Sequence, residues 1–246
     1  MKVSVVIPNY NNSKFLKDCV ESCASDESVY EIIVVDDCST DDSLKVLEEL
    51  KDKFDTLNTI ELPDNLGVSA ARNKGIRESL GDIIVLLDSD DMLTVDSVSK
   101  RMEVFNSNPD IDIVHGPVLK CHGDISYQMA VASKLSLHPS LITGQGVMIK
   151  ASVFQEYGLY YEPLRSKEDK EMFYRLGMHA KSPLPKKIKD KRVGYPVAFY
   201  RRHEGAKRKR RSNDLYFDVR TCMEFDKRLK QLELHGITED NTEFLR

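Results

Sequence analysis

Short apolar runs alternate with amphipathic stretches throughout the first half of the 246-residue chain. These candidate strands cover residues 3–7, 32–35, 59–62 and 83–87, of which residues 59–62 (TIEL) are only half apolar. Runs this short and this apolar are typical of strands that are covered on both faces of a sheet. Strands that alternate with helices through four rounds favour a parallel sheet joined by right-handed crossovers. The sequence therefore predicts an α/β fold with a Rossmann-like, doubly wound and mostly parallel sheet.

Three carboxylates follow the fourth apolar run within four positions, at Asp88, Asp90 and Asp91. Ligands of open α/β sheets collect outside the carboxyl ends of the strands, so this turn lies where a ligand is expected. Oxygen ligands on a tight turn suit Mg²⁺ or Mn²⁺ that is held together with substrate phosphates. The alternative is that the acids only end a strand and cap the following helix.

The second half of the chain has a looser pattern. Short strands are predicted over residues 111–115, 141–149 and 197–200, and a helix over roughly the last thirty residues. Glu168 and Asp169 precede another helical stretch and fall near its first turn. The helix dipole favours acids at that position, which is the structural alternative to a functional role.

The net charge of −4 conceals a strongly basic segment. Residues 186–211 hold twelve Lys or Arg against two acids, a charge of +10, which leaves −14 for the rest of the chain. Such a segment is either solvated surface or a binding surface for a polyanion or a phosphate. No stretch approaches the ~20 apolar residues of a membrane helix, and the first apolar run has no basic leader, so we expect a cytoplasmic protein.

Four ordered segments of the first half resemble the motifs of the family 2 glycosyltransferases, which have the GT-A fold. They are residues 5–11 (VVIPNYN), 33–41 (IVVDDCSTD), 65–75 (NLGVSAARNKG) and 86–91 (LLDSDD). One such motif could occur by chance, whereas four in order at family-like spacing are specific. Cys38 departs from the pattern, because the family commonly has glycine at that place.

The resemblance implies a GT-A domain over residues 1–205. Its nucleotide-sugar-binding half would span residues 1–110 and its acceptor-binding half residues 111–205. A basic segment and a C-terminal helix would occupy residues 206–246. The implied reaction is the transfer of a sugar from a nucleotide sugar, usually a UDP-sugar, to an acceptor hydroxyl, with inversion at the anomeric carbon.

The resemblance also implies which residues contact the nucleoside of the donor. Pro8 and Tyr10 would line the nucleoside pocket. Asp37, together with Asp36, would accept hydrogen bonds from the base. Capping of their own loops is the alternative role for both acids.

Further implied donor contacts come from Arg72, Asp88 and Ser89. Asp88 would touch the ribose. Arg72 would lie on the nucleotide side of the site, and a salt bridge inside the fold is its alternative role.

A catalytic base and a metal site follow from the same resemblance. Asp169 resembles the base that takes the proton from the acceptor hydroxyl. Asp90 and His203 would bind a divalent cation, Mn²⁺ or Mg²⁺, at the donor diphosphate, and Asp91 would support them. A structural role is the alternative for the lone histidine.

Other classes of protein share part of this pattern. A sugar nucleotidyltransferase would have the same fold class, but it needs a Gly-rich basic loop that residues 8–13 do not supply. A non-catalytic module that binds sugar nucleotides or nucleic acid would use the basic segment and has no need of the acids. A hydride-transfer enzyme is disfavoured because no G-x-G-x-x-G follows the first strand.

The sequence does not identify the acceptor molecule. An anionic glycan such as a teichoic-type polymer, a lipid-linked glycan at the membrane surface and a nucleic acid would all suit the basic segment. A lipid-linked acceptor would bring the protein into peripheral contact with a membrane. The basic segment could also close over the donor diphosphate as a mobile lid, as the loop in this position often does in the family.

Overall fold

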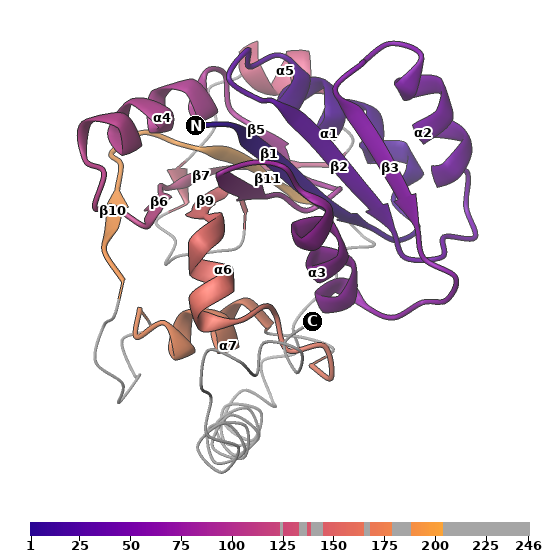
Figure 1. The fold of residues 1–246 in the computed structure, drawn as a ribbon. Helices are drawn as coiled ribbons and strands as arrows, with labels where there is room; N and C mark the ends of the chain where they lie inside the picture. The colour runs from indigo at the N-terminus through magenta and orange to yellow at the C-terminus, as the bar shows by residue number, and fades with distance from the viewer. Residues whose placement is uncertain (124, 133–136, 139–144, 165–167, 179–187, 204–246) are drawn as a thin grey trace, which may run out of the picture. The chain divides into compact units, whose positions relative to one another are not determined.

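The computed structural model describes residues 1–123, 125–132, 137–138, 145–164, 168–178 and 188–203. The chain divides into two compact units, Met1–Glu204 and Gly205–Arg246. All described residues belong to the first unit, whose helices and strands are labelled in Figure 1. The predicted C-terminal helix and residues 186, 187 and 204–211 of the basic segment lie outside the described residues.

A seven-stranded sheet has the order β10-β6-β9-β4-β1-β2-β3. Its strands are β1 (Val3–Asn9), β2 (Glu31–Asp36), β3 (Leu57–Glu61), β4 (Ile83–Leu86), β6 (Ile113–His115), β9 (Val147–Lys150) and β10 (Asp190–Arg192). Strands β3, β2, β1 and β4 are parallel, and β6 is parallel to β10. Strand β9 is antiparallel to both of its neighbours, β4 and β6. The prediction of an α/β fold with a mostly parallel sheet is therefore confirmed.

Helices cover both faces of this sheet (Figure 1). The covering helices are α1 (Ser13–Ala24), α2 (Ser43–Lys51), α3 (Val68–Glu78), α4 (Ser97–Ser107), α6 (Ala151–Tyr157) and α7 (Glu168–Arg175), whereas α5 (Tyr127–Ala132) packs beside α1. Successive residues of a strand point to opposite faces. Val5 of β1 therefore packs in a cluster with side chains of α1, α2 and α4, whereas Val6 packs with those of α3, α6 and α7. This burial on two faces explains why the central strands are apolar at every position.

A second, smaller sheet has the order β5-β11-β7-β8. Its strands are β5 (Met92–Leu93), β7 (Val118–His122), β8 (Leu137–His138) and β11 (Ala198–Arg202). Strand β11 pairs antiparallel with β5 and parallel with β7. Because β5 directly follows the acidic turn at residues 88–91, the small sheet brings the last described strand beside that turn.

Most predicted strand boundaries agree with the structure to within two residues. The strand predicted over residues 141–149 differs most, because only Val147–Lys150 forms a strand and residues 141–144 lie outside the described ones. Gly146 has a φ of 67°, a left-handed conformation that suits glycine and interrupts a strand. Among the residues that the structure describes, no helix is long and apolar enough to cross a membrane.

Candidate active site

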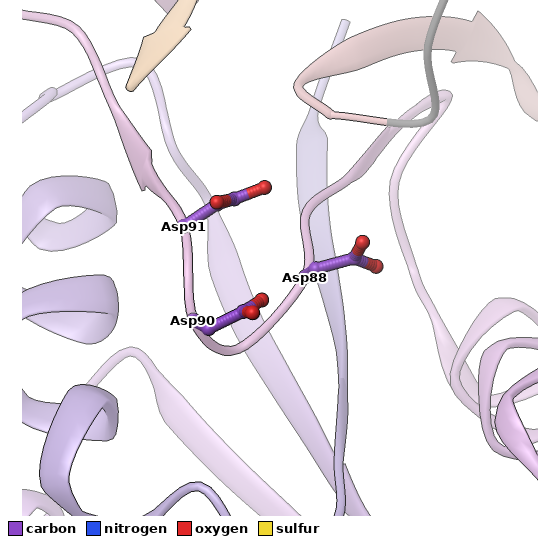
Figure 2. A group of neighbouring side chains, drawn as sticks. All are labelled: Asp88, Asp90 and Asp91. Carbon is purple, nitrogen blue, oxygen red and sulfur yellow. The ribbon is translucent and has the colours of Figure 1, made fainter. Parts of the chain in front are cut away.

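The acidic turn that follows β4 brings three carboxylates together (Figure 2). One side-chain oxygen each of Asp88, Asp90 and Asp91 lies within 4.8 Å of the other two. The backbone N–H of Asp91 donates to the carbonyl of Asp88 over 3.0 Å, which closes the turn. Carboxylates at this spacing disfavour one another's ionisation unless a cation is shared among them.

Asp91 is the most deeply buried of the three, with 1% of its surface exposed. Its Oδ1 accepts a hydrogen bond from the backbone N–H of Arg201 over 2.8 Å. Its Oδ2 is buried and has no hydrogen-bond partner among the described residues. Burial raises the pKa of the Asp91 carboxyl well above its usual value, and the charges of Asp90 and Asp88 raise it further. A buried carboxylate oxygen in this position fits a bound cation.

Asp90 and His203, the two residues predicted to hold a metal, lie in contact. Nε2 of His203 is 3.0 Å from Oδ2 of Asp90. Burial and the charge of Asp88 raise the pKa of Asp90, and the contact with His203 opposes that rise. The His203 ring packs against Phe15 with the ring centroids 4.6 Å apart. An imidazole nitrogen beside carboxylate oxygens is a donor set that divalent transition metals accept.

Arg72 joins the acidic turn to the second half of the chain. Its guanidinium comes from α3, and its side chain is only 2% exposed. Nη2 donates to Oδ1 of Asp88 over 2.6 Å, while Nη1 donates to Glu168 over 2.8 Å and to Asp169 over 3.2 Å. These contacts correspond to the salt bridge that was the alternative role for Arg72. The guanidinium therefore carries the positive charge among three carboxylates.

Asp169 lies in the first turn of α7, as predicted. Its Oδ1 accepts hydrogen bonds from Nη1 of Arg72 and, over 3.3 Å, from the hydroxyl of Tyr160. Burial raises the pKa of the Asp169 carboxyl to about 6, although Arg72 opposes the rise. A carboxylate with a pKa this close to neutrality can accept a proton from a bound hydroxyl and release it again.

The remaining contacts of the turn involve Asp88 and Ser89. Nε2 of Gln145 donates to Oδ2 of Asp88 over 3.3 Å, so both oxygens of this carboxylate have a donor. Nδ2 of Asn12 donates to the hydroxyl of Ser89 over 2.9 Å. Ser89 is 2% exposed, which leaves its side chain inside the turn.

Asp36 and Asp37 are buried and hold the loops around them. Asp36 accepts hydrogen bonds from Nδ2 of Asn9 and from both the N–H and the hydroxyl of Ser39, each over 2.7 Å. The carboxylate of Asp37 accepts from the backbone N–H groups of Leu66 over 2.7 Å and Gly67 over 2.8 Å. These contacts correspond to the loop-capping alternative, and they fix the loop before α3 against the end of β2.

The other predicted donor contacts lie near the same edge of the sheet. Pro8 is buried in β1 opposite Val35, and Tyr10 follows the strand with 46% of its surface exposed. Cys38 has a φ of 60°, a left-handed conformation for which glycine is favoured. The turn after β2 therefore keeps a glycine-like backbone although the residue is cysteine.

The residues that contact the candidate site but were not predicted from the sequence include Gln145, Tyr160 and Arg201. Gln145 and Tyr160 belong to loops, whose paths hydrophobic periodicity does not predict. Arg201 was counted with the basic segment, although it is 1% exposed. One signal was present, since Arg201 and His203 are two positions apart and so face the same side of an extended chain.

Comparison with known proteins gives a family match over the same part of the chain. A family model described as Glycosyl transferase family 2 matches residues 4–148. The poly(ribitol-phosphate) beta-glucosyltransferase of Bacillus spizizenii is 35% identical over 127 residues, which are 50% of this chain and 20% of that protein. The poly(ribitol-phosphate) beta-N-acetylglucosaminyltransferase TarS of Staphylococcus aureus is 32% identical over 102 residues, or 40% of this chain and 18% of TarS. The chain thus spans a small part of the length of these curated relatives.

Two solved structures resemble the fold. The crystal structure of S. aureus TarS 1-349 in complex with UDP-GlcNAc has a TM-score of 0.67 at 18% identity, and the match covers 89% of this chain and 64% of that one. The mannosyltransferase PcManGT of Pyrobaculum calidifontis, in complex with GDP-Man and Mn²⁺, has a TM-score of 0.64 at 14% identity and covers 83% of this chain and 58% of that one.

Proposed function

Because this chain belongs to glycosyl transferase family 2, we propose that it is an inverting glycosyltransferase that moves a sugar from a UDP-sugar to an acceptor hydroxyl. The observation that carries the proposal is the contact of one guanidinium, that of Arg72, with both Asp88 and Asp169. The side chain of Arg72 therefore bridges the carboxylate that we propose as the base and the turn that we propose for the donor. A direct transfer needs donor and acceptor held in a single site.

The acidic turn fits a divalent cation, Mn²⁺ or Mg²⁺. Asp90 and His203 would hold the ion, with Asp91 behind Asp90. The buried Oδ2 of Asp91, which has no partner among the described residues, supports this assignment because a nearby cation stabilises such an oxygen. The Mn²⁺ in the PcManGT complex adds support. A bound divalent cation supplies positive charge to the departing nucleoside diphosphate.

The donor would lie along the carboxyl ends of β1, β2 and β4. The residues proposed to contact it are Pro8, Tyr10, Asp36, Asp37, Arg72, Asp88 and Ser89. Each carboxylate oxygen accepts more than one hydrogen bond, so the loop contacts of Asp36 and Asp37 leave them able to accept from a base. The complexes of TarS with UDP and with UDP-GlcNAc support a uridine nucleotide as the carrier.

Asp169 would take the proton from the acceptor hydroxyl as that oxygen attacks the anomeric carbon from the face opposite the diphosphate. A pKa of about 6 leaves this carboxyl mostly ionised at neutral pH. Arg72 and Tyr160 both donate to its Oδ1, so we assign Oδ2 to the acceptor hydroxyl. Attack from the opposite face inverts the configuration of the transferred sugar.

An anionic glycan is the acceptor class that we propose. The segment of residues 186–211 carries +10, which would attract a polyphosphate chain. The two relatives named for transfer to poly(ribitol phosphate) support this class. Arg201 is buried and does not contribute to a positive surface, so the attraction would come from the other basic residues. A lipid-linked glycan and a nucleic acid are the acceptors against which the proposal is tested.

Transfer by the purified full chain tests the function directly. UDP-GlcNAc or UDP-glucose would be the donor, poly(ribitol phosphate) the acceptor and MnCl₂ the metal source. We expect release of UDP that requires the acceptor, stops with EDTA and resumes when Mn²⁺ is added in excess. Nuclear magnetic resonance of the product should show a β-linkage formed from the α-linked donor.

A different experimental result would contradict each part of the proposal. An α-linked product would contradict inversion, and turnover that EDTA leaves unchanged would remove the metal. Formation of a sugar nucleotide from UTP and a sugar phosphate would instead indicate a nucleotidyltransferase. Binding of UDP-sugars without turnover on an anionic glycan, a lipid-linked glycan or a nucleic acid would indicate a non-catalytic module.

A further inference from the structure

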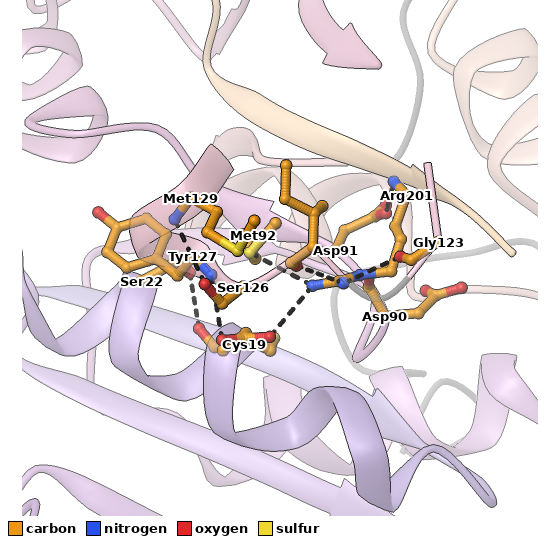
Figure 3. Close-up of polar contacts among 12 residues, drawn as sticks. Cys19, Ser22, Asp90, Asp91, Met92, Gly123, Ser126, Tyr127, Met129 and Arg201 are labelled. Carbon is orange, nitrogen blue, oxygen red and sulfur yellow. Dashed lines mark hydrogen bonds and ion pairs between the residues drawn. The ribbon is translucent and has the colours of Figure 1, made fainter. Parts of the chain in front are cut away.

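Arg201 is a buried arginine whose guanidinium contacts several separate segments of the chain (Figure 3). Nε donates to the backbone carbonyl of Asp90 over 2.9 Å. Nη1 donates to the carbonyl of Ile125 over 2.7 Å and to that of Gly123 over 3.3 Å. Nη2 lies 3.4 Å from Oδ2 of Asp18 on α1. The same nitrogen is 3.4 Å from Sδ of Met92, the first residue of β5.

The backbone and the neighbours of Arg201 contact the same acidic turn. The N–H of Arg201 donates to Oδ1 of Asp91, and His203, two residues further on, contacts Oδ2 of Asp90. The guanidinium carbon of Arg201 lies 4.7 Å from the centroid of the Phe15 ring, against which His203 also packs. The turn at residues 88–91 is therefore held by β11 and the residue that follows it, through the N–H and side chain of Arg201 and the side chain of His203.

The partners of the guanidinium indicate what it does. A charge is costly to bury unless its hydrogen bonds are made. Here the carboxylate of Asp18 lies 3.4 Å from the guanidinium, and the shorter bonds go to the carbonyls of Asp90 and Ile125. A planar guanidinium with donors in a fixed fork can bond both carbonyls at once, which the single ammonium of lysine cannot reproduce. The contact thus fixes the distance between the acidic turn and the carbonyls of Gly123 and Ile125.

We infer that Arg201 is a positioning residue for the metal site, which sets the backbone of Asp90 and the side chain of Asp91 in the arrangement that binds the cation. The inference rests on the proposed function, because it concerns the metal of that site. Groups that orient metal ligands from behind commonly change metal affinity by about 10–100-fold when they are replaced. Arg201 does not touch the cation in this assignment. It acts through the main chain of Asp90 and the side chain of Asp91.

Direct titration with Mn²⁺, in the absence of any sugar donor, tests the inference. The free Mn²⁺ would be measured by electron paramagnetic resonance for the wild-type full chain, Arg201→Lys and Arg202→Lys. Arg202 is the matched control because it is the next residue of β11 and is exposed. We expect Arg201→Lys to bind Mn²⁺ about 10-fold or more weakly and Arg202→Lys to bind like the wild type. Sugar transfer by Arg201→Lys should recover when Mn²⁺ is raised, because a positioning defect is offset by metal concentration.

Wild-type Mn²⁺ affinity in an Arg201→Lys variant that melts cooperatively would overturn the inference. Asp90→Asn separates this failure from failure of the proposed function. If Asp90→Asn binds Mn²⁺ as the wild type does, the metal assignment itself is wrong. If Asp90→Asn weakens Mn²⁺ binding and Arg201→Lys does not, the metal assignment holds and the positioning role of Arg201 is wrong.

Hydrogen exchange of the wild-type chain provides a second measurement should Arg201→Lys fail to fold. Because the guanidinium links the acidic turn to the carbonyls of Gly123 and Ile125, Mg²⁺ should slow amide exchange in peptides that contain the turn and in peptides that contain these two residues. Slowing in the peptide of residues 88–93 alone, with residues 121–127 unchanged, would contradict the link.

Discussion

Asn73 and Tyr160 are joined by two hydrogen bonds although 87 residues separate them in the chain. Nδ2 of Asn73 donates to the carbonyl of Tyr160 over 2.8 Å, and the N–H of Tyr160 donates to Oδ1 of Asn73 over 2.9 Å. Asn73 directly follows Arg72 on α3. Two consecutive residues of one helix therefore govern both groups that contact Asp169, namely the guanidinium of Arg72 and the hydroxyl of Tyr160.

Asn73→Ala should lower the free energy of unfolding by about 1–3 kcal/mol, because it leaves the buried N–H and carbonyl of Tyr160 without partners. Chemical denaturation measures this change. Lys74→Ala is the matched control, since Lys74 pairs with Glu78 on the exposed side of the same helix. That pair should contribute less than about 1 kcal/mol. Equal losses in the two variants would contradict the role given to the Asn73 clamp.

Asp169→Asn should reduce kcat by about 10²-fold or more, because an amide cannot accept the proton of the acceptor hydroxyl. Affinity for UDP, measured by calorimetry, should stay nearly unchanged. Glu168→Gln is a suitable control, as it removes a neighbouring carboxylate that also contacts Arg72 but leaves the base in place. A parallel loss of UDP affinity in Asp169→Asn would assign this residue to the donor pocket instead.

The pH dependence of kcat/KM should show an acidic limb set by Asp169. Burial raises the pKa of this carboxyl to about 6, and only its ionised form can accept a proton, so the rate should fall as the pH drops below that value. The hydrogen bond from Tyr160 lowers this pKa. Tyr160→Phe should therefore move the acidic limb to higher pH. Tyr161→Phe, in the adjacent residue, should leave it in place, and a shift of the Tyr160→Phe limb to lower pH would refute the assignment.

Replacing Lys207, Arg208, Lys209, Arg210 and Arg211 by Ser tests the basic segment, which lies outside the described residues at these positions. If the segment binds an anionic glycan, the KM for the acceptor should rise and its dependence on salt should flatten. The KM for the donor should not change. A rise in donor KM alone would indicate a lid over the diphosphate, and no change in either constant would indicate solvated surface.

Membership of family 2 and the GT-A fold could be predicted because three of the four motifs lie at the ends of strands with apolar runs and the fourth, residues 65–75, opens the helix α3. The family model and the likeness to TarS confirm both expectations. The acidic turn is equally local, since Asp88, Asp90 and Asp91 are close in the chain and a single tight turn brings them together. The motifs and the acidic turn could be predicted because each depends on residues that are close together in the sequence.

Roles that depend on burial could not be predicted in the same way. In the sequence, Arg201 is one of several basic residues in its segment. Its burial follows only from the pairing of β11 between β5 and β7, which encloses its side chain. Tyr160 reaches Asp169 only because Asn73 fixes its loop against α3. Asp37 shows a different difficulty. Its motif predicts a ligand contact, and in the structure its carboxylate also caps the loop of Leu66 and Gly67.

The place of β11 in the small sheet has a consequence for the order in which the protein is made. The acidic turn is complete once residue 91 has been synthesised, but Arg201 and His203 emerge more than a hundred residues later. Until then the nascent chain carries the turn without the strand that backs it. The central sheet can begin to assemble from β1, β2, β3 and β4, while the metal site that we propose can form only after the last described strand has been synthesised. We therefore expect ribosome-bound chains that end before residue 198 to hold part of the central sheet and to lack the proposed sugar transfer.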